Sequence, residues 1–214
     1  MTATDYRQTY HDLVRRDVFG LLPDRLGALL DFGGGIGATA AWLRAEGKAE
    51  RAVLFDQVAD GALPEIDAVE ALDLDDASAV SAALARTGPF DTILALDVLE
   101  HLKDPWAVVR QLDQALRPGG ALIVSLPNVG VLSVLVPLAR GRFEYQDAGV
   151  LDRTHLRWFT RSSAIELVTG AGLTLEAIEG YIPRRRARYL NTATLGLFER
   201  YLATQYKLRA RKAA

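Results

Sequence analysis

The chain of 214 residues contains no cysteine and only one methionine. Without cysteine there is no disulfide framework, no thiolate zinc site and no cysteine nucleophile. The first residues, MTATDYRQTYHDLVRRD, lack the basic start and apolar core of a signal peptide. No apolar run reaches the roughly 18 residues that span a bilayer. We therefore expect a soluble protein of the cytoplasm.

Composition indicates one globular domain with a sizeable core, because 50% of the residues are hydrophobic and 24% are charged. The net charge of -2 hides a split: residues 181–214 hold nine Lys or Arg and one Glu, which gives +8 and leaves -10 for residues 1–180. The basic tail is either a solvated helix face or a surface for an anionic partner. Within a single domain, 1–214, we expect a helical cap (1–24), a core (25–128), a following region (129–180) and this tail (181–214).

Apolar runs of strand length alternate with segments of helical period over the first two thirds of the chain. This pattern is typical of an α/β fold, a Rossmann-like, doubly wound and mostly parallel sheet of about seven strands with helices on both faces. The predicted strands are 28–32, 52–55, 68–72, 92–95 and 121–126, and the predicted helices are 38–46, 77–86 and 105–116. Asp104 and Pro105 supply the last of these helices with an N-cap and a first-turn proline.

Outside this alternation the pattern is less regular. Residues 6–22 predict an N-terminal helix, residues 162–171 another, and residues 173–181 a strand. A last helix is expected from about Thr192. Residues 129–139 are strongly apolar and are interpreted as a packed lid or as a surface that meets lipid.

The stretch LLDFGGGIGATAAWLR, residues 29–44, places a glycine-rich turn between the first strand and the next helix. In an open α/β sheet a ligand binds beyond the carboxyl ends of the strands, and glycines there let the backbone approach it closely. The pattern suits S-adenosylmethionine, but Gly33-x-Gly35-x-x-Ala38 also satisfies the relaxed dinucleotide fingerprint. The glycines alone leave both cofactors open.

Three aspartates lie at or just after the ends of successive predicted strands. Asp31 suits a ligand with a positive amino group and would repel a pyrophosphate, which favours the sulfonium amino acid over a dinucleotide. The competing interpretation is a turn aspartate that caps its own backbone. Asp56 can accept both ribose hydroxyls of either cofactor. Asp73 lies where a side chain could accept from an adenine amino group, although Asp75 and Asp76 are close enough to take its place.

At this point the sequence resembles the class I S-adenosylmethionine-dependent methyltransferases. The segment LLDFGGGIG resembles the first motif of that family, and FDTILALDVLEHLKDPWAVVRQLDQALRPGGALIVSLPN resembles its fourth strand, the following helix and the next strand. The second block is the more specific one and is similar to the ubiquinone-type, methionine-biosynthesis-associated and glycan methyltransferase branch. The resemblance covers about residues 25–128, which it implies are the cofactor-binding core.

The resemblance also implies a role for each cofactor residue. Asp31 and the glycine loop would hold the methionine portion, Asp56 the ribose, and Asp73 with Leu74 the adenine, while residues 95–99 would line the floor where donor meets acceptor. The implied cofactor residues are Asp31, Gly33, Gly34, Gly35, Gly37, Asp56, Asp73, Leu74, Ala95, Leu96 and Asp97. Gly34 departs from the common pattern and is expected to loosen the loop without changing the ligand. The product would be S-adenosylhomocysteine.

Methyl transfer from a sulfonium requires mainly near-attack positioning, and a hydroxyl acceptor must also lose a proton to a base. The chain has three histidines, of which His155 and His101 are the preferred catalytic candidates and His11 the weaker one. A structural histidine is the competing interpretation for each. Glu100 and His101 could also furnish two ligands to a divalent cation, as in some ubiquinone-type relatives, but no metal site is predicted.

The expected acceptor is an oxygen, less favourably a nitrogen, of a small molecule, a glycan or a lipid-linked compound. The later part of the chain should select it, since the earlier part serves the cofactor. Apolar residues 129–138 and the basic tail together allow peripheral contact with an anionic membrane. Nucleic acid is a disfavoured partner because the body is acidic. The alternatives are a nicotinamide-dependent oxidoreductase and a non-catalytic protein that binds S-adenosylmethionine.

Overall fold

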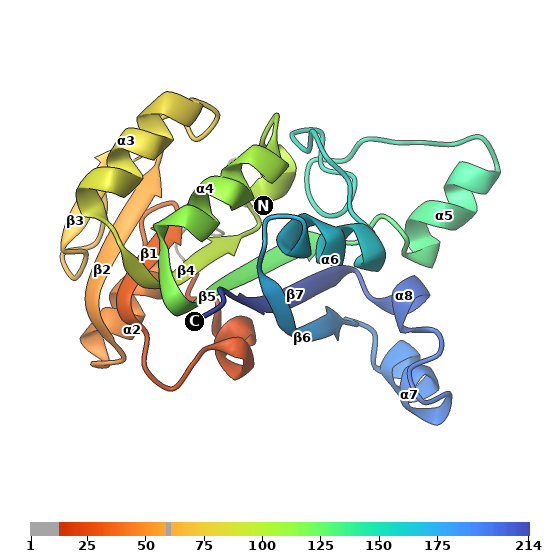
Figure 1. Ribbon diagram of the computed structural model, residues 1–214. Coiled ribbons are helices and arrows are strands. Elements are labelled where there is room, and N and C mark those ends of the chain that lie inside the picture. The colour runs from red at the N-terminus through yellow and green to blue at the C-terminus, as the bar shows by residue number, and fades with distance from the viewer. Residues whose placement is uncertain (1–12, 59–60) are drawn as a thin grey trace.

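The computed structural model describes residues 13–58 and 61–214. A seven-stranded sheet with strand order β3-β2-β1-β4-β5-β7-β6 forms its centre (Figure 1). The first five strands pair in parallel, and β7 runs antiparallel between β5 and β6. The strands are β1 Gly27–Phe32, β2 Ala49–Asp56, β3 Ala68–Ala71, β4 Phe90–Leu96, β5 Leu116–Pro127, β6 Thr174–Tyr181 and β7 Gln205–Arg211. The expected doubly wound, mostly parallel sheet is confirmed.

Helices cover both faces of this sheet (Figure 1). Leu84, Val109 and Leu167 belong to the large core cluster under α3, α4 and α6. Val18 and Leu43 belong to a second cluster on the opposite face, under η1 and α2. The helices are η1 Arg16–Leu21, α2 Ala38–Ala45, α3 Ala77–Thr87, η2 Leu99–His101, α4 Pro105–Ala115, α5 Leu132–Ala139, α6 Arg161–Thr169, α7 Arg185–Ala193 and α8 Glu199–Leu202.

Side-chain caps fix where two of the crossover helices begin. The Asp104 carboxylate accepts a hydrogen bond from the Ala107 N–H at 3.0 Å, and Pro105 opens α4 as predicted. Asp76 caps α3 in the same way, accepting from the N–H groups of Ser78 and Ala79 at 3.0 Å. Both caps lie just beyond the carboxyl ends of strands, so they also fix the loops that form the site.

The prediction of a last helix from Thr192 is wrong. The structure instead has α7, the short α8 and then β7, which is an interior strand of the sheet. The segment QYKLRAR alternates apolar and basic side chains, a period-two pattern in which the buried Tyr206, Leu208 and Ala210 share one face. The terminal part of the basic tail is therefore structural and not an appendage.

The basic residues of β7 pair with acids on neighbouring elements. The Lys207 ammonium donates to the Asp17 carbonyl at 2.6 Å and lies 3.7 Å from the Glu179 carboxylate. Arg209 forms an ion pair with Glu176 at 2.8 Å, and Arg211 shares the same acid. These pairs explain how a strand with three cations can sit inside a sheet.

Deleting residues 204–214 should prevent folding, because β7 joins β5 to β6 and its loss would expose two long strand edges. We expect no cooperative thermal transition by circular dichroism and rapid proteolysis. A chain that lacks only Ala213 and Ala214 is the matched control and should unfold like the full chain. A cooperatively folded deletion variant would contradict the placement of β7.

The predicted N-terminal helix over residues 6–22 lies partly outside the described residues, and His11 lies there as well. The described part forms only the 3₁₀ helix η1. Just before it, the Arg15 N–H donates to Thr39 Oγ1 at 3.1 Å, which ties this segment to the first turn of α2. The chain therefore crosses the start of α2 on its way into the sheet.

The apolar run over residues 129–139 forms α5, which projects from the end of the sheet (Figure 1). Val131 and Val134 are buried in a small cluster with Leu151, whereas Leu132, Val136 and Leu138 are exposed. This helix is thus only partly covered. None of the helices in residues 13–58 and 61–214 is long and apolar enough to cross a membrane.

Candidate functional site

A cleft of about 740 Å³ opens beyond the carboxyl ends of β1 to β4. Gly33, Asp56, Asp73 and Asp97, each at or just after the end of one of these strands, line one part of it. Another part of the cleft is lined by residues 147–150, 152 and 154–155, together with Tyr181 of β6 and Gln205 of β7. Because the strand order reverses between β1 and β4, this edge is the switch point where doubly wound sheets bind ligands.

The alternate glycines of the loop after β1 all adopt left-handed backbone. The φ angles of Gly33, Gly35 and Gly37 are +76°, +62° and +78°, a region that L side chains rarely occupy. A Cβ on Gly33 would also lie 2.4 Å from Cγ2 of Val98. The spacing of the glycines thus follows from the backbone, which folds tightly over the end of β1 and into α2.

Gly34, which was expected to loosen the loop, has a different role. A Cβ at this position would lie 2.3 Å from Cγ of Asp31. The loop therefore closes directly over the Asp31 carboxylate, and only glycine allows so short an approach. The second glycine and the acid form one packed unit.

Asp31 lies in β1 with only 2% of its surface exposed. Burial raises the pKa of this carboxyl to about 7, although a hydrogen bond from the Ala40 N–H partly offsets the effect. The neighbouring Asp56 carboxylate raises the pKa further. A buried acid of this kind gains from a cationic ligand group, and an ammonium next to the loop fits that requirement.

The acids at the ends of β2 and β3 have separate partners. Asp56 accepts from the N–H groups of Gly35 at 2.8 Å and Val58 at 2.9 Å, so its carboxylate is fixed at the rim of the cleft. Asp73 accepts from Gln57 Nε2 at 2.9 Å, and Asp75 accepts from the Lys103 N–H at 2.8 Å. Asp73, Leu74 and Asp75 all line the cleft.

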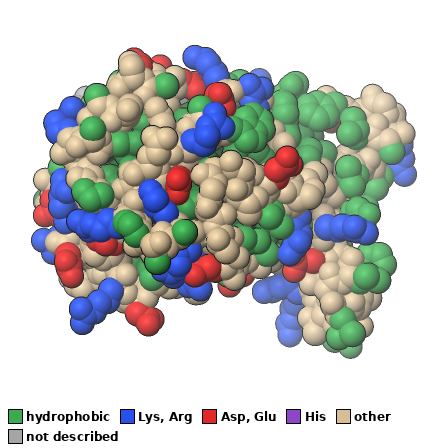
Figure 2. Space-filling view, in the orientation of Figure 1, with side chains coloured by type: hydrophobic (Ala, Val, Ile, Leu, Met, Phe, Trp, Pro, Cys, Tyr) green, Lys and Arg blue, Asp and Glu red, His purple; other side chains and the backbone are tan. Residues whose placement is uncertain are grey.

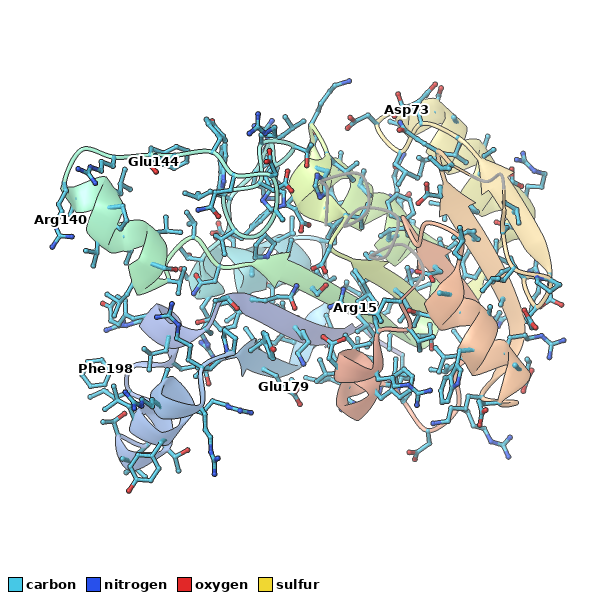
Figure 3. The ribbon with its side chains drawn as sticks, turned by 180° about the vertical axis from the view of Figure 1, so that it is seen from behind. Arg15, Asp73, Arg140, Glu144, Glu179 and Phe198 are labelled. Atoms are coloured by element: carbon cyan, nitrogen blue, oxygen red, sulfur yellow. The ribbon has the colours of Figure 1, made fainter. Side chains whose placement is uncertain are left out.

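Asp97 is held by donors from three distant segments. Its carboxylate accepts from Ser125 Oγ at 2.6 Å, from Gln205 Nε2 at 2.6 Å and from Arg15 Nη1 at 2.5 Å. Figure 3 labels Arg15 beside the central strands. Asp97 also has a φ of +54°, which is uncommon for a residue other than glycine. The three donors stabilise this conformation at the floor of the cleft.

Sequence reasoning missed these three partners of Asp97, because no local motif marks them. It also included Ala95 and Leu96, which do not line the cleft: Ala95 is fully buried in the sheet and Leu96 is half-buried in β4. Asp31, Gly34, Gly35 and Gly37 are likewise not among the residues that line the cleft. Of the residues that the resemblance implies for the cofactor, Gly33, Asp56, Asp73, Leu74 and Asp97 line the cleft.

His101 and His155 meet on the other wall of the cleft. Their rings contact edge to face with centroids 4.8 Å apart. His101 Nδ1 lies 3.2 Å from the Thr154 carbonyl, and His155 Nδ1 lies 3.1 Å from the Val150 carbonyl. A carbonyl can only accept, so each Nδ1 carries a proton, and the neutral tautomer that these contacts select has its lone pair on Nε2.

Glu100 joins the two histidines beneath this wall. Its backbone carbonyl accepts from the N–H groups of Leu156 at 2.8 Å and Arg157 at 3.0 Å, which fixes the segment that carries His155. The side chain is 1% exposed, and its Oε2 has no hydrogen-bond partner among the described residues. Burial and the nearby Asp97 hold the pKa of Glu100 well above its ordinary value.

The charge state of His101 and the spacing of Glu100, His101 and His155 determine which chemistry this wall supports. Burial, and then the neighbouring His155, lower the pKa of His101, so its ring is a neutral base near pH 7. Glu100, His101 and His155 also offer ligand atoms within 4.8 Å of one another, a donor set that suits a transition metal or zinc better than magnesium. The wall can therefore accept a proton or hold a cation.

Comparison with known proteins agrees with this arrangement. Residues 3–178 match the family model described as a methyltransferase domain. A ubiquinone biosynthesis O-methyltransferase from Ralstonia nicotianae is 30% identical over 134 residues, which cover 58% of this chain and 55% of that protein. The chain spans about half the length of the curated relatives it matches.

Two solved structures show the same fold. An S-adenosylmethionine-dependent methyltransferase from Mesorhizobium loti has a TM-score of 0.61 at 18% identity and covers 92% of this chain and 96% of its own. The N-methyltransferase NodS from Bradyrhizobium japonicum, in complex with S-adenosylhomocysteine, has a TM-score of 0.57 at 16% identity, covering 99% and 88%. With its glycine loop, its sheet and a family match over most of its length, the chain belongs to the class I S-adenosylmethionine-dependent methyltransferases.

Proposed function

We propose that this protein transfers a methyl group from S-adenosylmethionine to a hydroxyl oxygen of a small-molecule, glycan or lipid-linked acceptor. The observation that carries the proposal is the pair of histidines, His101 and His155, whose rings are in contact and which line the same cleft as Gly33 of the glycine loop. Oxygen is favoured over nitrogen because the pair supplies the base that a hydroxyl needs. The curated relatives named O-methyltransferases support the same choice.

The residues around the loop fit the cofactor. The Asp31 carboxylate would pair with the ammonium group of the methionine portion, and the left-handed glycines would let the backbone lie against it. Asp56, already fixed by two N–H groups, keeps lone pairs for the ribose hydroxyls. Asp73 and Leu74 would border the adenine.

When bound, S-adenosylmethionine supplies an activated methyl group for in-line displacement by the acceptor oxygen. The histidine pair takes the acceptor proton on an Nε2 lone pair, and the backbone carbonyls hold both rings in the tautomer that leaves Nε2 free. The hydrogen bonds from the N–H groups of residues 156 and 157 to the Glu100 carbonyl fix the position of the histidine pair relative to the floor of the cleft. Positioning by these walls supplies most of the rate, since displacement from a sulfonium requires little covalent assistance.

Gly34→Ala should lower affinity for S-adenosylhomocysteine by about tenfold or more, because the new Cβ would displace the Asp31 carboxylate that it meets at 2.3 Å. Isothermal titration calorimetry measures the change. Gly20→Ala is the matched control, since a Cβ there meets its nearest atom at an ordinary 3.8 Å. Unchanged affinity in Gly34→Ala would show that the ligand does not depend on the acid beneath the loop.

The activity is tested by incubating the protein with isotopically labelled S-adenosylmethionine and separate pools of phenols, soluble glycans and extracted lipids. The proposal expects label in an ether-linked methyl group of one pool, identified by mass spectrometry, with the same turnover after treatment with a chelator. Label on an amine would show that the acceptor atom is nitrogen and not oxygen. Loss of turnover on chelation would assign the histidine pair to a metal instead of a proton, and binding without turnover in any pool would favour the non-catalytic alternative.

A further inference from the structure

An arm interrupts the hairpin between β6 and β7. Tyr181 and Gln205 are paired in register, and the Thr204 N–H donates to the Tyr181 carbonyl at 2.9 Å, so a short turn could close the two strands. The chain instead inserts the arm, residues 182–203, which contains α7 and α8 and projects from the lower right of the molecule in Figure 1. An insertion of this size at a site that needs only a turn calls for a role of its own.

The root of the arm is fixed to the body. Ile182 and Ala203 are buried, and Asn128 Nδ2 donates to the Ala203 carbonyl at 2.8 Å and to the Arg200 carbonyl at 3.0 Å. Beyond this root, no residue of α7 or α8 is buried. The arm is therefore an anchored projection with an uncovered outer surface.

The outer surface is strongly basic. The guanidinium groups of Arg184, Arg185, Arg186 and Arg188 are exposed and form no ion pair with any acid in the described part of the chain. In β7, by contrast, Arg209 and Arg211 are paired with Glu176, and Lys207 with Glu179. These four unpaired cations, three in α7 and one at its N-cap, create a local positive potential on a protein whose other part is acidic.

Large apolar side chains extend from the same arm into solvent. Leu195 is 96% exposed, Tyr189 79% and Leu197 71%, and Phe198 is exposed as well. Figure 2 shows apolar side chains beside basic ones at the lower right, and Figure 3 shows Phe198 at the outer edge of the arm. Leu195 also has a φ of +51°, a position where a turn would ordinarily select glycine or asparagine. Contact with water alone does not explain why an exposed leucine occupies this position.

We propose that the arm, residues 182–203, docks on an anionic lipid surface. Basic side chains beside exposed leucine and aromatic side chains match the two layers of such a surface, since the cations meet the head groups and the apolar tip enters the acyl boundary. A nucleic acid would use the arginines but would leave Leu195 and Leu197 in water. The charge and the apolar tip together select lipid.

Docking would also bring the cleft close to a membrane-bound acceptor, an inference that rests on the proposed function. Tyr181 and Thr204, where the arm begins and ends, both line the cleft, as does Gln205. An arm bound to lipid would hold this wall close to the head groups, so a lipid-linked acceptor could reach the histidine pair without leaving the membrane. The proposal thus narrows the acceptor to the lipid-linked class.

The docking is tested by sedimentation with vesicles, with no cofactor or acceptor present. The protein should partition onto vesicles of mixed phosphatidylglycerol and phosphatidylcholine, bind less at high salt, and not bind phosphatidylcholine alone. Arg185→Glu with Arg188→Glu should weaken partitioning by about tenfold or more, and Leu195→Asn with Leu197→Ser should weaken it to a similar extent. All four positions are exposed, so the fold should be retained.

Arg25→Glu with Arg110→Glu is the matched control, because both arginines are exposed, lie outside the arm and carry the same change of charge. This variant should partition within about twofold of the parent. Equal weakening in the control would show that only the net charge of the protein matters. Undiminished partitioning of the arm variants would show that another part of the protein contacts the vesicle. Tighter binding to bulk tRNA than to the vesicles would favour nucleic acid as the partner. Each of these results would overturn the proposal. Failure of methyl transfer in solution would leave the vesicle result unaffected, so the two proposals fail separately.

Discussion

Asp31→Asn should reduce affinity for S-adenosylhomocysteine by about 100-fold or more while making the ligand-free protein more resistant to unfolding at pH 8. The affinity falls because asparagine cannot pair with the ligand ammonium. The stability rises because Asp31 is ionised at pH 8 while buried, and its pKa of about 7 shows that burial disfavours the charged form. Asparagine removes that cost and is close in shape to the protonated acid.

The sign of the pH dependence follows from linkage. Because the pKa of Asp31 is about 7 in the folded state and its ordinary value is 3.8, the unfolded chain loses the Asp31 proton first as the pH rises. Between these two values the folded state binds more protons, so the contribution of Asp31 to the free energy of unfolding falls with rising pH. Asp31→Asn should therefore gain most over the parent above pH 7 and little at pH 4.

Calorimetry and urea unfolding at pH 6 and pH 8 measure the two halves of this prediction. Asp24→Asn, an exposed acid outside the site, is the matched control and should change neither quantity. A variant that binds like the parent would remove Asp31 from the cofactor site. A variant that is less stable than the parent at pH 8 would show that the buried carboxylate already has a stabilising partner.

Ligand affinity of the parent protein should rise by about tenfold from pH 6 to pH 8, because the ligand ammonium pairs with the ionised form and that form is the minority below the pKa of about 7. Asp31→Asn should show no such rise. A flat profile in the parent would mean that the acid is ionised throughout this range.

Replacing the histidine pair should have the largest effect on turnover. His101→Gln and His155→Gln should each lower kcat by about 10²- to 10⁴-fold, since a general base contributes about this much. Cofactor affinity should change little, because neither histidine belongs to the set proposed to hold the cofactor. The kcat of the double variant should be only slightly lower than that of the less active single variant, because the two rings act as one unit. Arg153→Gln, an exposed neighbour in the same segment, is the control.

The pH profile distinguishes a base from a structural histidine. Because the pKa of His101 is lowered from its ordinary value of 6.5, its ring stays neutral to lower pH, and kcat should stay high until the pH falls below that ordinary value. Parallel loss of kcat and cofactor affinity in both variants would assign the pair a structural role. Turnover of the variants at the parental rate would remove it from the reaction.

Much of the fold could be predicted from the sequence, because its signals are local. The first five strands and their crossover helices follow from apolar runs and caps such as Asp104, which act within a few residues. The loop at Gly33, Gly35 and Gly37 follows from backbone sterics that only glycine satisfies. The acids at the strand ends meet at one edge because parallel strands end there.

The rest depends on contacts between distant segments. β7 was mistaken for a helix because Lys207, Arg209 and Arg211 suggest a solvent-exposed surface, and only their acidic partners on other elements explain a strand. Arg15 and Gln205 reach Asp97 from opposite ends of the chain, so no spacing could reveal them. The arm was counted within a uniform basic tail until the structure separated its unpaired arginines from the paired ones of β7.

The most direct test of the account is a calorimetric titration of the full chain with S-adenosylhomocysteine, with NAD as the comparison ligand, at pH 8 where Asp31 is ionised. Both nucleosides could use Asp56, whereas only the homocysteine ligand carries an ammonium for the buried acid. We expect saturable binding of S-adenosylhomocysteine and none of NAD. Binding of NAD alone, or of neither ligand, would contradict it.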